Sequence, residues 1–347
     1  VNQKRGIRWN ARKAFLDPAR RRPNLVVLTE CHVRRLTFEG QRAKGILFTR
    51  GGSAFRATAR QEVILAAGAI GSPQLMELSG IGDPAHLKRI GVDPLHALPG
   101  VGENLQDHLQ LRTIFAVTGA RTLNDRAATP WGKAGIALQY ALTQSGPMAM
   151  APSQLGIFTR SGPEHNRANI EYHVQPLSLD AFGQPLHRTP ALTVSVCNLR
   201  PTSRGATHAK APDAAMAPAI QPNYLATEED RKVAAESIRH ARRLMATETM
   251  ARYRPVEVKP GPGDESDAAL AELAGAIGTT IFHPVGTARM GSDADAVVDP
   301  KLKVRGIGGL RVADCSIMPT IVSGNTHAAA VMIGERAAEL LIAAGRG

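Results

Sequence analysis

Two histidines lie on short glycine-containing turns in the last quarter of the chain. His283 opens the run His-Pro-Val-Gly-Thr, and His327 closes the run Ser-Gly-Asn-Thr-His. An imidazole on a rigid turn can accept a hydroxyl proton, and two of them could flank one reacting atom. A lone histidine is more often structural. A metal site at this pair is not favoured, because neither histidine has a cysteine or carboxylate at ligand spacing.

Two apolar segments end in turns of small residues, at 63–71 and at 309–314. Such turns let the backbone approach a ligand closely, and a following helix offers free N–H groups to phosphate or carbonyl oxygens. Taken singly, each turn is more typical of a plain strand-to-helix corner. No Gly-x-Ser-x-Gly nucleophile turn occurs.

The elements that must position these residues fall into three stretches. In the first, β-branched runs predict a small antiparallel unit that feeds a buried strand, followed by a helix over 74–78 with Ser72 as its N-cap. The middle stretch predicts strands and one amphipathic helix that begins near Thr227. The last predicts a strand and an apolar helix. The predicted strands are 24–29, 33–38, 44–49, 56–65, 170–175, 191–199 and 309–312, and the final helix is 328–343.

Composition limits the function classes. The 347 residues carry a formal net charge of +12, with much of the excess between Lys4 and Arg22, but only 4% are aromatic. Without a recognition module, this basic arm does not indicate nucleic-acid binding. No apolar run reaches the ~18 residues of a membrane-spanning helix. Three scattered cysteines predict a reducing, cytoplasmic location, with peripheral contact to the inner membrane left open.

Four ordered motifs resemble those of the glucose-methanol-choline (GMC) flavin oxidoreductases, and in particular the choline dehydrogenase-like alcohol dehydrogenases. The resemblance covers nearly the whole chain, and Leu-Arg-Pro-Thr-Ser-Arg-Gly at 199–205 and Pro-Asn-Tyr-Leu at 222–225 add to it. The first motif is Gly-Ala-Ile-Gly-Ser-Pro-Gln-Leu-Met-Glu-Leu-Ser-Gly-Ile-Gly at 68–82, and the second is Pro-Gly-Val-Gly-Glu-Asn-Leu-Gln-Asp-His at 99–108. The third is His-Pro-Val-Gly-Thr at 283–287. The fourth spans 310–327, beginning with Leu-Arg-Val-Ala-Asp-Cys-Ser and ending with Gly-Asn-Thr-His.

The resemblance implies an FAD enzyme that oxidises an alcohol to an aldehyde by hydride transfer to flavin N5. His283 matches the catalytic histidine and His327 the second catalytic position, which is Asn or His in different members. The pair would hold the alcohol oxygen and stabilise developing alkoxide character. His108 is interpreted as a structural or cofactor-lid residue. The residues that the resemblance assigns to the cofactor are Val33, Ala67, Gly68, Ala313, Asp314, Asn325, Thr326 and Ala328.

The fold that the resemblance implies is α/β (α+β), a partial Rossmann-like FAD-binding domain with an antiparallel-sheet substrate domain. The expected domains are 1–107 for the first part of the FAD-binding domain, 108–276 for the substrate domain, and 277–347 for the C-terminal part with the catalytic residues. Family members begin with a Gly-x-Gly-x-x-Gly phosphate turn, and this sequence contains none in a strand-turn-helix context. Since the sequence also starts at Val1 instead of Met, we expect that a first nucleotide-binding unit precedes it.

Two alternatives to a complete enzyme stay open at this stage. The chain could be a non-catalytic fragment unable to bind FAD alone, or a basic protein that binds anionic surfaces. Within the enzyme class, the electron acceptor could be a quinone, oxygen or another carrier, and the oligomeric state is unknown. The alcohol itself is not identified, because no aromatic cage for choline is evident. Four residues could line a pocket, although packing is favoured for them: Tyr140, Tyr172, His173 and Phe182.

Overall fold

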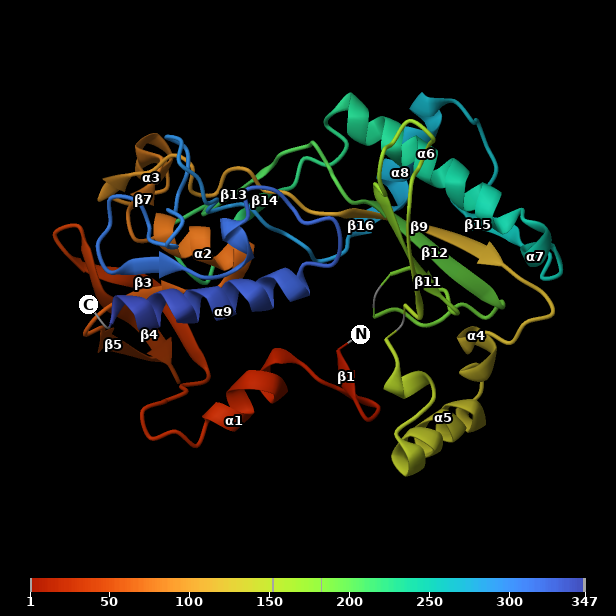
Figure 1. The fold of residues 1–347 in the computed structure, drawn as a ribbon, viewed down its shortest axis with the longest axis horizontal. Coiled ribbons are helices and arrows are strands. Elements are labelled where there is room, and N and C mark those ends of the chain that lie inside the picture. The colour runs from red at the N-terminus through yellow and green to blue at the C-terminus, as the bar shows by residue number, and fades with distance from the viewer. Residues whose placement is uncertain (1, 152, 182, 346–347) are drawn as a thin grey trace. The chain divides into compact units, whose positions relative to one another are not determined.

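The computed structural model describes residues 2–151, 153–181 and 183–345. It separates into two compact units (Figure 1). Unit 1 comprises residues 1–26, 109–200 and 227–281, and unit 2 comprises 27–108, 201–226 and 282–347. Residues 201–226 therefore group with unit 2, although they lie inside the stretch that the sequence assigned to the substrate domain. The domain names remain predictions.

An antiparallel sheet forms the centre of unit 1. Its hydrogen-bonded order is β10-β11-β12-β9-β15, and β16 also pairs with β9. The register places Tyr172 opposite Val196, which in turn lies opposite Leu111. The strands are β9 (Leu109–Ala116), β10 (Leu155–Thr159), β11 (Ile170–Gln175), β12 (Ala191–Asn198), β15 (Val256–Lys259) and β16 (Gly278–Thr280).

Helices α6 (Glu228–Met245) and α8 (Asp267–Ile277) pack against each other and against this sheet (Figure 1). The Thr227 hydroxyl caps α6 by accepting the Asp230 N–H at 3.2 Å, as its Thr-Glu-Glu-Asp opening predicted. Apolar residues at helical spacing, including Val233, Ile238 and Ala241, are buried. The smaller elements of unit 1 are β1 (Gln3–Lys4), β2 (Ile7–Arg8), η1 (Arg12–Leu16), α1 (Asp17–Ala19), α4 (Leu123–Arg126), α5 (Pro130–Thr143), η2 (Pro147–Ala149) and α7 (Glu248–Ala251).

Unit 2 is built from four small sheets around a large apolar core. Strands β3 (Cys31–Glu39), β4 (Arg42–Arg50) and β5 (Ser53–Thr58) are antiparallel, and the parallel pair is β6 (Val63–Leu65) with β17 (Leu310–Val312). The other pairs are β7 (Ile81–Gly82) with β8 (His96–Ala97) and β13 (Ala206–His208) with β14 (Ala219–Gln221). The helices are α2 (Gly68–Glu77), α3 (Pro84–Arg89), η3 (Cys315–Ile317) and α9 (His327–Ala344).

The core of unit 2 joins segments that are far apart in sequence. Leu65 of β6, Met76 of α2, Val285 of the His-Pro-Val-Gly-Thr turn and Val312 of β17 are all buried in one cluster. Removing such apolar side chains from water contributes ~25 cal/mol per Å² of apolar area. The two kinds of sheet, one antiparallel and one parallel with helices, confirm the predicted α/β (α+β) fold class.

Three local predictions were wrong. Residues 24–29 form no strand, and Val26 and Leu28 are 78% and 55% exposed, because no strand of the described chain lies beside them. The predicted strand 56–65 is two strands, one in each of two sheets. The helix predicted over 74–78 begins earlier, at Gly68, and Ser72 lies inside it instead of capping it.

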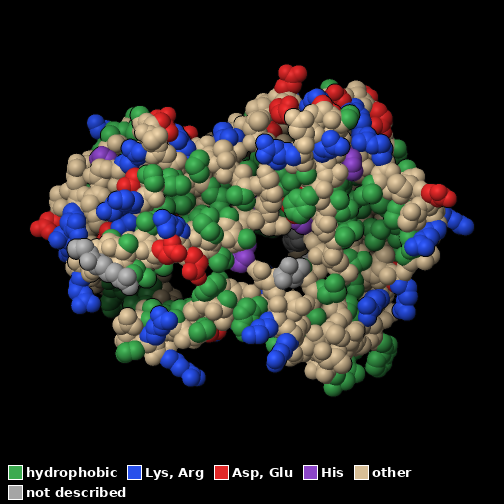
Figure 2. All heavy atoms as spheres, viewed as in Figure 1, with side chains coloured by type: hydrophobic (Ala, Val, Ile, Leu, Met, Phe, Trp, Pro, Cys, Tyr) green, Lys and Arg blue, Asp and Glu red, His purple; other side chains and the backbone are tan. Residues whose placement is uncertain are grey.

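Basic side chains are dispersed over the face of the molecule seen in Figure 2 and do not gather in one patch. Among the described residues, no helix combines the length and the apolar character needed to cross a membrane.

Candidate functional site

The carboxyl ends of β6 and β17 meet at one edge of the parallel pair. Leu65 lies opposite Val312, and the Ala313 N–H donates to the Leu65 carbonyl at 2.8 Å. Asp314 follows, and its Oδ2 accepts both the Gly68 N–H at 3.0 Å and the Ser72 hydroxyl at 2.6 Å. The structure thus brings two predicted cofactor residues, Gly68 and Asp314, into direct contact.

Gly68 has a backbone that a side chain would strain, and it faces open space. Its φ is +78°, in the left-handed region that favours glycine, and a Cβ built on it would meet no atom within 4 Å. Ligands of α/β folds bind at the carboxyl ends of parallel strands, where a helix begins. The open space beside this backbone therefore fits part of a flat cofactor such as FAD.

The turn that carries His283 is tied to two other motif segments. Val285 and Gln106 exchange backbone hydrogen bonds of 2.9 and 3.1 Å. The Thr287 hydroxyl donates to the Ala69 carbonyl at 2.6 Å, inside α2. At Gly286 a Cβ would lie 2.5 Å from the Asn104 carbonyl oxygen, so only glycine allows this approach. Three of the sequence motifs therefore converge on the His283 turn.

The side chain of Asp107 holds the backbone of both His108 and His283. Its Oδ1 accepts the N–H groups of His108 and His283, both at 2.9 Å. Its Oδ2 accepts the Tyr224 hydroxyl at 2.5 Å. The carboxylate is 6% exposed, so these bonds satisfy a buried charge. Sequence reasoning missed this role, although Asp107 and Tyr224 both lie in motifs that it had quoted.

The rings of His108 and His283 meet edge to face, with their Nδ1 atoms 3.1 Å apart. The amide nitrogen of Asn325 lies 3.3 Å from Nε2 of His283. An amide NH₂ group can only donate, so Nε2 of His283 accepts and its proton sits on Nδ1, facing His108. His283 is 8% exposed, so this ring lies in a largely buried position.

The other predicted catalytic residue, His327, is the first residue of α9 instead of part of the preceding turn. It is exposed, and its side chain makes no hydrogen bond or ion pair with the residues that the structure describes. Asn325, which the sequence assigned to the cofactor, is the residue of this segment that contacts His283. The chemical roles of His283 and His327 remain predictions.

The remaining predicted cofactor residues lie in three places. Ala67 is the exposed N-cap of α2, beside Gly68. Thr326 is buried as the N-cap of α9, and Ala328 is exposed in its first turn. Helix α9 packs on η3, which begins directly after Asp314. Val33 is half-buried in β3, opposite Phe48.

Cys315, next to Asp314, is a poor nucleophile in this setting. Burial raises the pKa of its thiol, and the neighbouring Asp314 carboxylate raises it further. Because the thiolate is the reactive form, this environment disfavours a redox role.

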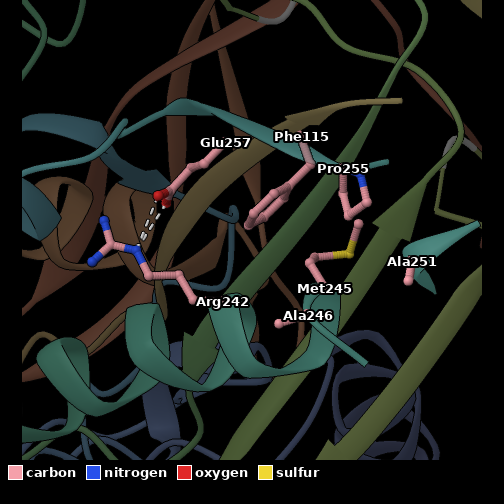
Figure 3. Close-up of a pocket in the computed structure, with 7 residues that line it drawn as sticks. All are labelled: Phe115, Arg242, Met245, Ala246, Ala251, Pro255 and Glu257. Atoms are coloured by element: carbon pink, nitrogen blue, oxygen red, sulfur yellow. Dashed lines mark hydrogen bonds and ion pairs between the residues drawn. The ribbon is translucent and has the colours of Figure 1, made fainter. Parts of the chain in front are cut away.

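One cavity of about 340 Å³ lies in unit 1, lined by Phe115, Arg242, Met245, Ala246, Ala251, Pro255 and Glu257 (Figure 3). It contains none of the predicted site residues. Arg242 and Glu257 close one side with an ion pair of 3.0 Å.

Tyr172 is fully buried in β11 with its hydroxyl 2.8 Å from Nδ1 of His240, so it packs within unit 1. Phe182 lies outside the described residues.

Comparisons with known proteins identify the family of this chain. The family described as GMC oxidoreductase matches residues 1–110 and 201–334. An alcohol dehydrogenase [acceptor] of Pseudomonas putida is 38% identical over 346 residues, covering 99% of this chain and 62% of the relative. The mitochondrial choline dehydrogenase of Homo sapiens is 40% identical over 338 residues, covering 97% and 57%.

A solved structure shares the fold. Formate oxidase from Aspergillus oryzae RIB40, studied for its FAD modification, superposes with a TM-score of 0.91 at 27% identity, covering 99% of this chain and 64% of that one. The chain belongs to the GMC oxidoreductase family, whose members bind FAD. It spans about three fifths of the length of the curated relatives it matches.

Proposed function

We propose that this chain carries the catalytic histidine and part of the cofactor site of an FAD-dependent enzyme that oxidises an alcohol to an aldehyde. The observation that supports this best is the buried His283 imidazole, which is held by neighbours on both ring nitrogens and keeps a lone pair on Nε2. Two similar proteins are named as dehydrogenases of alcohols, one of them of choline.

In this proposal His283 Nε2 accepts the hydroxyl proton of the alcohol. A general base of this kind contributes ~100-fold to 10,000-fold to a rate. The Asn325 amide, released from Nε2 when the substrate binds, would donate to the alcohol oxygen. Asp107 fixes the backbone of the base, and His108 fixes its ring. His327 is proposed as a second group near the alcohol oxygen.

FAD, when bound, supplies the hydride acceptor. The residues that would hold it are Gly68, through its accessible backbone, and Asp314, through the hydrogen bonds that orient the start of α2. Ala67, Ala313 and the 325–328 segment are proposed neighbours of the cofactor. The alcohol and the final electron acceptor remain open within this proposal.

The test is flavin reduction under anaerobic conditions. FAD-loaded protein should lose its oxidised flavin absorbance when a primary alcohol is added, and His283→Ala should slow this by at least ~100-fold without losing FAD. An exposed histidine of the same unit, His32, provides the control variant His32→Gln. Unchanged bleaching in His283→Ala would mean that His283 is not the base.

A second candidate is a chain that cannot hold FAD by itself. The parallel sheet has only two strands in the described chain, and Ile64 of β6 is 42% exposed. A buried parallel strand is normally covered on both faces. Equilibrium dialysis of the 347-residue chain with FAD decides between the candidates, since micromolar or tighter binding contradicts the second one.

A further inference from the structure

A compact cluster of titratable side chains lies in unit 2, apart from the residues assigned to the reaction. Glu77 ends α2, His86 lies in α3, and His208 ends β13. We call these three residues the Glu77 cluster. Glu77 is 1% exposed and His86 is 8% exposed, so the cluster buries an acid and an imidazole together. The proposed alcohol oxidation uses none of them.

The candidate ligand atoms of the cluster lie close enough together to share a cation, although one pair of them is hydrogen-bonded. Nε2 of His86 is 3.7 Å from Oε2 of Glu77, and Nδ1 of His208 is 2.7 Å from Oε1. The three candidate ligand atoms all lie within 4.8 Å of one another. Two ligands of a tetrahedral zinc ion, each ~2.0–2.1 Å from the metal, are ~3.3 Å apart.

His86 supplies an independent sign of a missing ligand. Its Nε2 is buried and has no hydrogen-bond partner among the described residues. The gap of 3.7 Å to Glu77 is too long for a hydrogen bond. A buried polar atom without a hydrogen-bond partner destabilises the folded chain unless a ligand satisfies it. A cation between His86 and Glu77 would do so.

The surroundings of the cluster resemble the outer shell of a metal site. Oε1 of Glu103 lies 3.0 Å from Nε2 of His208, so a carboxylate orients the far side of this ring. The Ala209 N–H donates to Oε2 of Glu77 at 2.7 Å, which fixes the buried carboxylate. The side chains of His208 and Glu103 are 25% and 56% exposed, and they give an ion a route from solvent.

One contact opposes the metal. Nη2 of Arg89 lies 2.9 Å from Nδ1 of His86, so in the metal-free protein this nitrogen accepts and Nε2 holds the proton. A metal at Nε2 requires that proton on Nδ1 and Arg89 turned away. Arg89 is exposed and can turn into solvent. Arg89 therefore competes with the ion, and its removal should favour binding.

We propose that Glu77, His86 and His208 bind one divalent cation of the zinc type, with water at the fourth position. Carboxylate and imidazole ligands suit zinc among the common divalent ions. In the metal-free protein both nitrogens of His208 face carboxylates, so its ring carries two protons. Coordination through Nδ1 releases one proton to solvent. The ion joins α2, α3 and β13.

The structure holds two further clusters of similar composition. The first consists of Glu171, His173 and Cys197, on β11 and β12. On the neighbouring strand β9, Arg112 lies opposite Ser195 of β12. In the cluster of Glu164, His165 and Glu236, Nζ of Lys232 is 3.4 Å from Glu164.

The experiment titrates the 347-residue chain with Zn²⁺ against a chromophoric chelator, after dialysis with EDTA. We expect one ion per chain at micromolar or tighter affinity, at least 10-fold weaker binding in His86→Gln, and several-fold tighter binding in Arg89→Met. The control His32→Gln removes an exposed imidazole of the same unit and should bind as the parent does. Calorimetry in buffers of different ionisation enthalpy should report release of about one proton.

A parent chain that binds no zinc at micromolar concentrations would overturn the proposal, as would equal affinity in His86→Gln and the parent. Tighter binding in Arg89→Met with weaker binding in His86→Gln supports it. Both substitutions leave the buried Glu77 and its bond to Ala209 intact, so circular dichroism should show a folded chain in each case.

Discussion

The Nδ1 atoms of His108 and His283 lie 3.1 Å apart, and the backbone N–H groups of both residues donate to the same oxygen of Asp107. One carboxylate therefore fixes the backbone of two residues 175 positions apart, and their rings meet edge to face. This arrangement leaves Nε2 of His283 as the basic atom of the pair. Substitutions of His283 test the base, and substitutions of Asp107 test the residue that positions it.

Replacing His283 by Gln should lower kcat for alcohol oxidation by ~100-fold or more, because the amide cannot accept the proton that Nε2 accepts. The FAD content should stay at the parent level, since the side chain is predicted to act on the substrate. Stopped-flow reduction of FAD-loaded protein measures the rate. A loss of less than threefold would show that the proton goes to another group.

Asp107→Ala should destabilise the chain by about 3 kcal/mol, because two buried N–H groups and the Tyr224 hydroxyl lose their acceptor. Asp107→Asn is the matched control, since its side-chain oxygen can still accept the two N–H bonds, and it should cost less. Urea unfolding monitored by circular dichroism gives both values. Equal losses in the two variants would contradict the role assigned to Oδ1.

Gly68→Ala should weaken FAD binding by ~10-fold, which corresponds to ~1.4 kcal/mol, because the new methyl group enters the open space beside the turn. Gly52 offers a close control: its φ is +83°, and a Cβ there also meets no atom within 4 Å. Both alanine variants should lose ~1 kcal/mol of stability through the left-handed backbone. Only Gly68→Ala should change FAD affinity in fluorescence titrations. Equal FAD affinity in both variants would place the cofactor elsewhere.

Unit 1 should lose stability as the pH falls from 7.5 to 5.5. Burial lowers the pKa of His240 below its ordinary value of 6.5, with a smaller contribution from Arg243. The folded chain therefore keeps His240 neutral while the unfolded chain takes up a proton, so stability is present above pH ~6.5 and is lost below it. His240→Gln should flatten this dependence in urea titrations at the two pH values. The same slope in the variant and the parent would show that another group is responsible.

The sequence predicted the fold well where the signal is local or is carried by an ordered motif. The cap at Thr227 and the antiparallel unit of β3 and β4 follow from side-chain pattern and turn chemistry. The start of α2 at Gly68 could not be predicted, because its N–H bonds to Asp314, 246 residues later. The apolar run at 24–29 looked like a strand, yet apolar pattern alone provides no partner.

The site was predicted in part. The residues around His283 predicted a turn, which the structure shows. Gly68 and Asp314 were each expected near the cofactor, and the structure adds a direct contact between them. The contact between His108 and His283 was not expected, because the sequence around His108 gives no information about a side chain 175 positions away. The Glu77 cluster was equally hidden, since its three residues come from separate segments with no ligand spacing.

The pairing of β6 with β17 also sets an order of events during synthesis on the ribosome. Residues 63–65 leave the ribosome long before 310–312, their only strand partner in the described chain. All strands of the large sheet lie between 109 and 280, so unit 1 can complete its sheet first. Unit 2 must wait with an unpaired strand, because non-local contacts form only after the loop between them closes. Nascent chains of this protein should therefore carry β6 without its strand partner until residues 310–312 have left the ribosome.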